Sequence, residues 1–154
     1  MGKTTCKRIN RLQGRWWKCC RFHIRVQIIE ANYKLLPKGY QPIDSLEVKW
    51  FYEVENESNH LECPASINGR LKQKIEDICV QTWKALGIRD LCRIDLRCDK
   101  QETLFILEVN SPPGLTPPEV SKASYFPLAA RVAGIDHQEL LRKIILVTRK
   151  RYGI

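Results

Sequence analysis

Apolar and polar residues alternate along two short stretches, residues 92–96 and residues 105–110, and a polar segment, residues 99–102, separates them. Successive side chains of a β-strand point to opposite faces of a sheet, so this alternation predicts two strands joined as a hairpin. We place the centre of the hairpin between Lys100 and Gln101. The rest of the chain is best understood around this predicted hairpin, because its polar face carries most of the candidate chemistry.

The polar face of the hairpin is predicted to bring two acidic side chains together. In the expected register Asp95 lies across from Glu108. Arg93 lies across from Asn110 on the same face. Two neighbouring carboxylates repel each other unless a positive charge neutralises them, and a hard divalent cation with oxygen ligands would do so. The loop at residues 111–116 contains Pro and Gly, follows directly, and is suited to presenting backbone N–H groups to an anion.

The remaining pattern predicts further strands and three helices. Strands are expected over residues 22–36 and 46–52, and helices over residues 71–86, over residues 124–134 and after residue 136. Asn68 or Ser66 could cap the first helix, and Gly87 is expected just beyond its end. Asp136 and Glu139 have the spacing of a capping box at the start of the last helix. These elements predict an α+β domain, with a mostly antiparallel sheet of about four strands and helices packed on it.

Positive charge is concentrated at the N-terminal end of the chain. The 154 residues carry a formal net charge of +9. Residues 1–39 hold ten Lys and Arg with Glu30 as the single acid, whereas residues 40–154 hold sixteen residues of each sign. This asymmetry argues against nucleic-acid binding by the whole protein. We expect a basic, poorly ordered extension over residues 1–21 and one balanced domain over residues 22–154.

The composition favours a cytoplasmic protein without a membrane anchor. No apolar run reaches transmembrane length, and no apolar stretch follows the basic N-terminus as in a secretory signal. Residues 1–29 are Arg-rich and free of acids, which leaves an organellar transit peptide as an alternative. The seven cysteines are odd in number and form no C-x-x-C pair, which favours reduced thiols. Basic residues beside Trp16 and Trp17 leave nucleic-acid binding by the extension as a further alternative.

A series of short motifs runs from Cys63 to Leu146. In order they are CPA at 63–65, ALG at 85–87, RID at 93–95, LEVN at 107–110, PGLT at 113–116, SYFP at 124–127 and AARVAG at 129–134. A single E-x-N motif would be weak, but the ordered series resembles the C-terminal part of ATP-grasp ligases, most closely the D-alanine–D-alanine ligase family. The resemblance implies that the fold is the second half of an ATP-grasp module.

The resemblance implies an ATP-dependent ligase that joins a carboxylate to an amine. In such enzymes ATP phosphorylates the carboxylate, and the amine then attacks the acyl phosphate. The implied cofactors are ATP and two Mg²⁺ ions, for which Mn²⁺ could substitute. Asp95 would hold one ion, Glu108 would bridge both, and Asn110 would hold the second. The implied partner is D-alanine for a peptidoglycan precursor, with D-lactate or D-serine as alternatives for the second substrate.

The resemblance gives four residues roles beyond metal binding. Arg93 would bind phosphate or acyl-phosphate oxygens, and the Gly114 N–H would face the developing oxyanion. Ser124 and Tyr125 match positions that contact the carboxylate of the incoming amino acid. Simpler alternatives remain: Arg93 could pair with Asp95, Gly114 could serve as a turn residue, and Ser124 could cap a helix.

The sequence departs from the ligase pattern in two ways. Seven residues separate Thr116 from Ser124, a few more than the resemblance leads us to expect. The glycine-rich loop and the phosphate-binding lysines of such ligases have no counterpart in residues 1–36. We therefore expect a truncated chain with little ligase activity alone. The alternative is a non-catalytic or complementing subunit, completed by a separate N-terminal half or by a homodimer partner.

Overall fold

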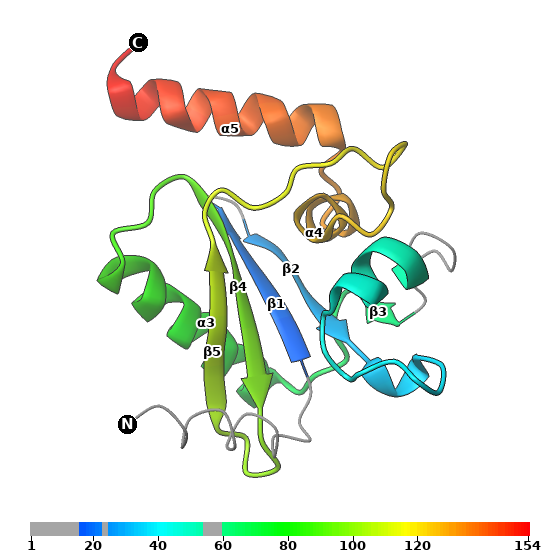
Figure 1. The fold of residues 1–154 in the computed structure, drawn as a ribbon. Coiled ribbons are helices and arrows are strands. Elements are labelled where there is room, and N and C mark those ends of the chain that lie inside the picture. The colour runs from blue at the N-terminus through cyan, green and yellow to red at the C-terminus, as the bar shows by residue number, and fades with distance from the viewer. Residues whose placement is uncertain (1–15, 23–24, 54–59) are drawn as a thin grey trace, which may run out of the picture.

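The protein has an α+β fold in which helices cover both faces of a five-stranded antiparallel sheet, with strand order β3-β2-β1-β4-β5 (Figure 1). The computed structural model describes residues 16–22, 25–53 and 60–154. The strands are β1 Trp16–Phe22, β2 Arg25–Ala31, β3 Leu61–Glu62, β4 Leu91–Cys98 and β5 Leu104–Asn110. The helical segments are η1 Tyr33–Leu35, η2 Val48–Tyr52, α3 Gly69–Ala85, α4 Tyr125–Val132 and α5 His137–Tyr152. The α+β prediction is confirmed.

One face of the central sheet packs on α3. Ile94 and Leu96 of β4 are fully buried there against Ile75 of α3. Of the two expected caps, Asn68 is the one that begins the helix, because its Oδ1 accepts a hydrogen bond from the backbone N–H of Leu71 at 2.8 Å. The apolar half of the alternating pattern in β4 therefore forms the core beneath this helix.

The opposite face of the sheet is covered by α4 and, at its end, by α5 (Figure 1). Phe126 and Ala129 of α4 are buried against Ile29 of β2. Asp136 caps α5, since its Oδ1 accepts a hydrogen bond from the Glu139 N–H at 2.8 Å, as the sequence predicts. Arg93, Asp95 and Arg97 alternate with the core residues of β4, so the polar half of the strand belongs to this second face.

The predicted hairpin is confirmed as β4 and β5. Asp95 pairs with Glu108, and Arg93 pairs with Asn110. Because neighbouring strands lie about 4.8 Å apart, paired side chains on one face come within reach of each other. The register therefore places two carboxylates, a guanidinium and an amide together.

The predicted centre of the hairpin, between Lys100 and Gln101, was wrong, because that centre would place Asp95 across from Ile106. Cys98 pairs with Leu104, which centres the turn on Gln101, and the register then shifts next to Asp95. This bulge adds one residue to β5. Without the bulge Asp95 would not face Glu108, so an irregularity in the ladder creates the pairing that matters most.

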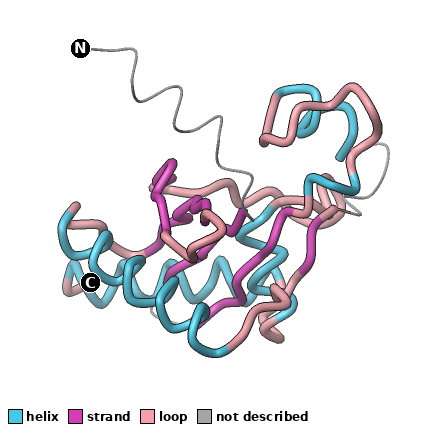
Figure 2. Tube along the Cα trace, turned by 90° about the horizontal axis from the view of Figure 1, so that it is seen from below, coloured by secondary structure: helices cyan, strands magenta, loops and turns pink. Residues whose placement is uncertain are grey.

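The strand predicted over residues 46–52 was also wrong, because this segment is helical. Val48 and Tyr52 are buried four residues apart, whereas Trp50 between them is 68% exposed. Burial at a spacing of four is the helical pattern. The predicted strand over residues 22–36 ends earlier than expected, with β2 at Ala31 followed by the short helix η1. The segment that carries η1 and η2 projects beyond the sheet (Figure 2).

The predicted N-terminal extension overlaps the sheet. It was expected to cover residues 1–21, but β1 begins at Trp16 and pairs with both β2 and β4. β1 lies in the middle of a sheet that has helices on both faces, and a strand covered on both faces needs no clean alternation of apolar and polar residues. Residues 1–15 lie outside the described residues, so the order of that part stays a prediction.

Candidate functional site

A buried ion pair forms the centre of the polar face of β4. Arg93 Nε lies 2.7 Å from Asp95 Oδ1, and Arg93 Nη2 lies 2.9 Å from Asp95 Oδ2. The two side chains are 10% and 6% exposed. Such a two-point contact fixes both the position and the plane of the guanidinium. The alternative that Arg93 pairs with Asp95 is therefore confirmed, and the pair lies next to the other predicted site residues.

Glu108 and Asn110 extend the site on the adjacent strand. The Glu108 side chain is 57% exposed, and its Oε1 lies 3.9 Å from Arg93 Nη2. Asn110 is half-buried, and its Nδ2 has no hydrogen-bond partner among the described residues. A buried donor without a partner is costly, so this amide is suited to a ligand that accepts hydrogen bonds. Carboxylate oxygens of Asp95 and Glu108 thus lie near one guanidinium, and Asn110 is paired with Arg93 on the neighbouring strand.

The oxygen atoms of these side chains are suitable ligands for a magnesium ion that keeps some of its water. Mg²⁺ favours one or two carboxylates together with water and substrate phosphates over an all-protein cage. Among the described residues no group of three or more His, Cys, Asp or Glu side chains could hold a metal by itself. Asp95 and Glu108 supply two carboxylates, and Asn110 supplies an amide. An ionised carboxylate has about four acceptor positions, which is more than the two hydrogen bonds from Arg93 use.

The loop after β5 is open at its glycine. Gly114 is exposed, and a Cβ built on it would meet no atom within 4 Å. The loop is anchored at its start, where Ser111 Oγ donates a hydrogen bond to the Leu91 carbonyl at 3.2 Å. Packing in the free chain therefore does not require glycine here. This open space is what a substrate approaching the backbone would need.

Ser124 and Tyr125 lie side by side in sequence but in different environments. Ser124 stands before the first residue of α4, is half-buried, and makes no side-chain capping hydrogen bond. Tyr125 is 5% exposed, and its hydroxyl lies 2.9 Å from Asp44 Oδ1 and 2.7 Å from Glu53 Oε1. Only Ser124 therefore keeps a partly accessible side chain.

A cluster of buried polar residues beside the site was missed by the sequence analysis. Tyr33 and His60 stack with ring centroids 5.8 Å apart, and His60 Nε2 lies 3.4 Å from Glu53 Oε1. Burial raises the pKa of Tyr33, and the carboxylates of Asp44 and Glu53 raise this pKa further. These residues come from three sequence segments with no recognisable motif. Only their convergence in space reveals them.

A family model described as "D-ala D-ala ligase C-terminus" matches residues 23–146. The chain belongs to this family. It is 40% identical over 97 residues to the D-alanine–D-alanine ligase of Pelotomaculum thermopropionicum, covering 63% of this chain and 29% of that ligase. It is 30% identical over 128 residues to the D-alanine–D-alanine ligase of Nitrosococcus oceani, covering 79% of this chain and 39% of that ligase.

Solved structures agree with the fold of this ligase-family chain. A crystal structure of D-alanine–D-alanine ligase from Bacillus anthracis complexed with ATP aligns with a TM-score of 0.66 and 22% identity. The alignment covers 93% of this chain and 40% of the ligase. The family is thus shown, and the chain spans well under half the length of these relatives. Within the described ranges no helix is both long and apolar enough to cross a membrane.

Proposed function

We propose that this chain carries the metal- and phosphate-binding half of an ATP- and Mg²⁺-dependent ligase that forms a D-alanyl-D-alanine-type peptide bond. The observation that carries the proposal is the register of β4 and β5, which sets Asp95 against Glu108 beside Arg93 and Asn110. Membership of the ligase family supports it.

Three side chains would hold two metal ions in this proposal. Asp95 would bind one Mg²⁺, Asn110 Oδ1 would bind the other, and Glu108 would bridge them. When bound, the ions would neutralise charge on the phosphates and align the transferred group. The exposed Glu108 can adjust to the ions, whereas the buried Asp95 is fixed by Arg93.

The other site residues would act on the substrates. Arg93 would donate to phosphoryl oxygens, and the unpartnered Asn110 Nδ2 is a second donor for them. The N–H of the exposed Gly114 would stabilise the oxyanion that forms when the amine attacks the acyl phosphate. Ser124 would donate its uncapped hydroxyl to the carboxylate of the incoming D-amino acid. D-lactate or D-serine in that position would require little change in these contacts.

The metal site is tested by titration with Mn²⁺, followed by the loss of the free-ion signal in electron paramagnetic resonance. Glu108→Gln should weaken binding at least about tenfold, which corresponds to about 1.4 kcal/mol. Glu119→Gln is a matched control, because Glu119 is an exposed acid in the loop before α4. Equal affinities for the wild type and Glu108→Gln would contradict the assignment.

A complementing subunit is a second candidate function. The observation that favours it is the 29% and 39% shares of the two ligases that the chain spans. The test is to supply the preceding portion of the Pelotomaculum thermopropionicum ligase together with this chain and measure ADP release with D-alanine. ADP release that requires both polypeptides would support the subunit, and none from a stable complex would contradict it.

A further inference from the structure

Tyr125, the first residue of α4, connects two parts of the molecule that are distant in sequence. Its hydroxyl lies 2.9 Å from Asp44 Oδ1 and 2.7 Å from Glu53 Oε1, and these residues are 81 and 72 positions away in the chain. Burial, followed by the two nearby carboxylates, raises the pKa of Tyr125, so the phenol stays protonated and donates. Both acceptors belong to the segment around η2. Tyr125 therefore ties this segment to α4.

The ring of the same tyrosine contacts the candidate active site. The Arg93 Cζ atom lies 5.1 Å from the centre of the Tyr125 ring, within the range of a cation–π contact. Asp95 already holds the guanidinium through two hydrogen bonds. Arg93 thus contacts Asp95 on its own strand and Tyr125 on α4, besides the Glu108 carboxylate 3.9 Å away on β5. A guanidinium held by both Asp95 and Tyr125 cannot swing away without breaking one of them.

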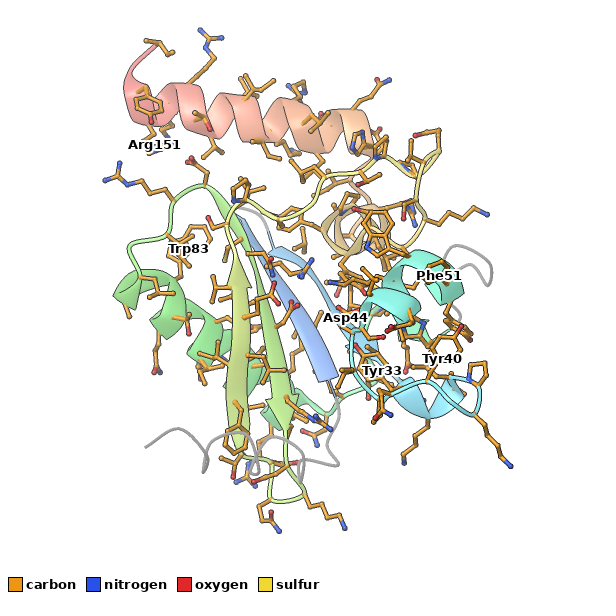
Figure 3. All side chains as sticks on the ribbon, viewed as in Figure 1. Tyr33, Tyr40, Asp44, Phe51, Trp83 and Arg151 are labelled. Atoms are coloured by element: carbon orange, nitrogen blue, oxygen red, sulfur yellow. The ribbon has the colours of Figure 1, made fainter. Side chains whose placement is uncertain are left out.

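The segment around η2 is itself well anchored on the side that faces the sheet. Val48 is fully buried, and Lys49 Nζ lies 3.4 Å from Asp44 Oδ2. Figure 3 shows Asp44 on the side toward the sheet and Phe51 on the outer side. The Tyr125 hydroxyl therefore meets acceptors that are held in place.

We propose that Tyr125 is a positioning residue for Arg93 and not a contact of the substrate carboxylate. The proposal rests on the proposed function, because the role of Arg93 there is to bind phosphoryl oxygens. The ring holds the guanidinium at the angle that phosphate binding needs, and the hydroxyl ties α4 to the segment around η2. The two contributions are separable, since phenylalanine keeps the ring and methionine replaces it with a flexible side chain.

The test compares two ligands of the 154-residue chain, inorganic phosphate and Mn²⁺. Phosphate is followed by NMR through the Arg93 Nε–H signal, and Mn²⁺ by electron paramagnetic resonance. Tyr125→Met should weaken phosphate binding about tenfold, as expected for a desolvated cation–π contact. It should leave Mn²⁺ affinity unchanged, because the proposed metal ligands Asp95, Glu108 and Asn110 lie on β4 and β5 and keep their oxygens in this variant. Tyr125→Phe should restore phosphate binding to within about twofold.

Tyr152→Met is the matched control. Tyr152 is exposed on α5, and its ring lies 4.3 Å from Arg151 Cζ, so the same kind of contact is lost away from the site. It should change neither affinity. Equal losses of phosphate and Mn²⁺ binding in Tyr125→Met would show a general loosening of the fold and would overturn the proposal. Unchanged phosphate binding would overturn it as well.

Two further outcomes separate this proposal from the proposed function. If the wild-type chain binds neither ion, the proposed function fails, and the Arg93 Nε–H signal decides the positioning role. A signal that persists in the wild type and is lost only in Tyr125→Met supports that role, and an unchanged signal overturns it. If Tyr125→Met does not fold, Tyr125→Phe decides: wild-type phosphate affinity supports the role of the ring, and a tenfold loss contradicts it.

Discussion

The buried pair of Arg93 and Asp95 leads to a quantitative prediction about stability. Arg93→Met removes the two hydrogen bonds that Arg93 donates to the Asp95 carboxylate, which is 6% exposed. Removing one partner of a buried ion pair costs about 3–5 kcal/mol. For a chain of this length each kcal/mol lowers Tm by about 2–4 °C, so a fall of roughly 6–20 °C is expected. Urea and thermal unfolding followed by circular dichroism measure this loss.

Two controls make the measurement specific. Glu102→Gln breaks an exposed pair, in which Glu102 Oε2 lies 3.2 Å from Lys74 Nζ and both side chains are 39% exposed, and should cost less than about 1 kcal/mol. Arg93→Met combined with Asp95→Leu should recover most of the loss, because an apolar pair leaves no buried charge. A loss in Arg93→Met no larger than in Glu102→Gln would refute the reasoning.

Four further predictions address activity, the loop, a thiol and a helix cap. The 154-residue chain should release ADP from ATP and D-alanine more slowly than about 1 s⁻¹, and faster turnover would show that the part of the related ligases outside the matched region is dispensable. Gly114→Ala should change the free energy of unfolding by less than about 1 kcal/mol, because the added Cβ meets no atom; a larger loss in urea unfolding would contradict the open loop. Burial raises the pKa of Cys63 to about 11, so the thiol's contribution to stability is full below the ordinary thiol pKa of about 9 and is lost as the pH rises toward 11. Cys63→Ser should remove that pH dependence of the unfolding midpoint, and an unchanged profile would contradict it. Asp136→Ala should cost about 1 kcal/mol by removing the cap of α5, and no change in Tm would exclude that role.

The sequence predicted the hairpin because both of its strands alternate and its turn is polar. It also predicted the caps Asn68 and Asp136, whose hydrogen bonds reach only three residues along the chain. The bulge was missed because alternation does not reveal one extra residue opposite a regular strand. Sequence patterns therefore predict structure over a few neighbouring residues, but they do not predict a small irregularity in strand pairing.

The contacts of Tyr125 could not be predicted from sequence. Asp44 and Glu53 lie more than seventy residues away and belong to no motif. Residues 46–52, between them, were predicted as a strand, because the apolar residues alternate. The same residues also fit the spacing of a helix. The burial of Val48 and the exposure of Trp50 decide for the helix, and burial depends on the neighbouring elements. The contacts that hold Tyr125 beside the site therefore depend on the tertiary structure and not on a local sequence pattern.

In the proposed function the hairpin of β4 and β5 binds a divalent metal between its two strands. Paramagnetic broadening of backbone amide signals by substoichiometric Mn²⁺ in the ¹⁵N-labelled chain tests this most directly. We expect the amides of Asp95, Glu108 and Asn110 to broaden first, while those of α5 stay sharp. Broadening that begins elsewhere, or that spreads evenly over the chain, would contradict it.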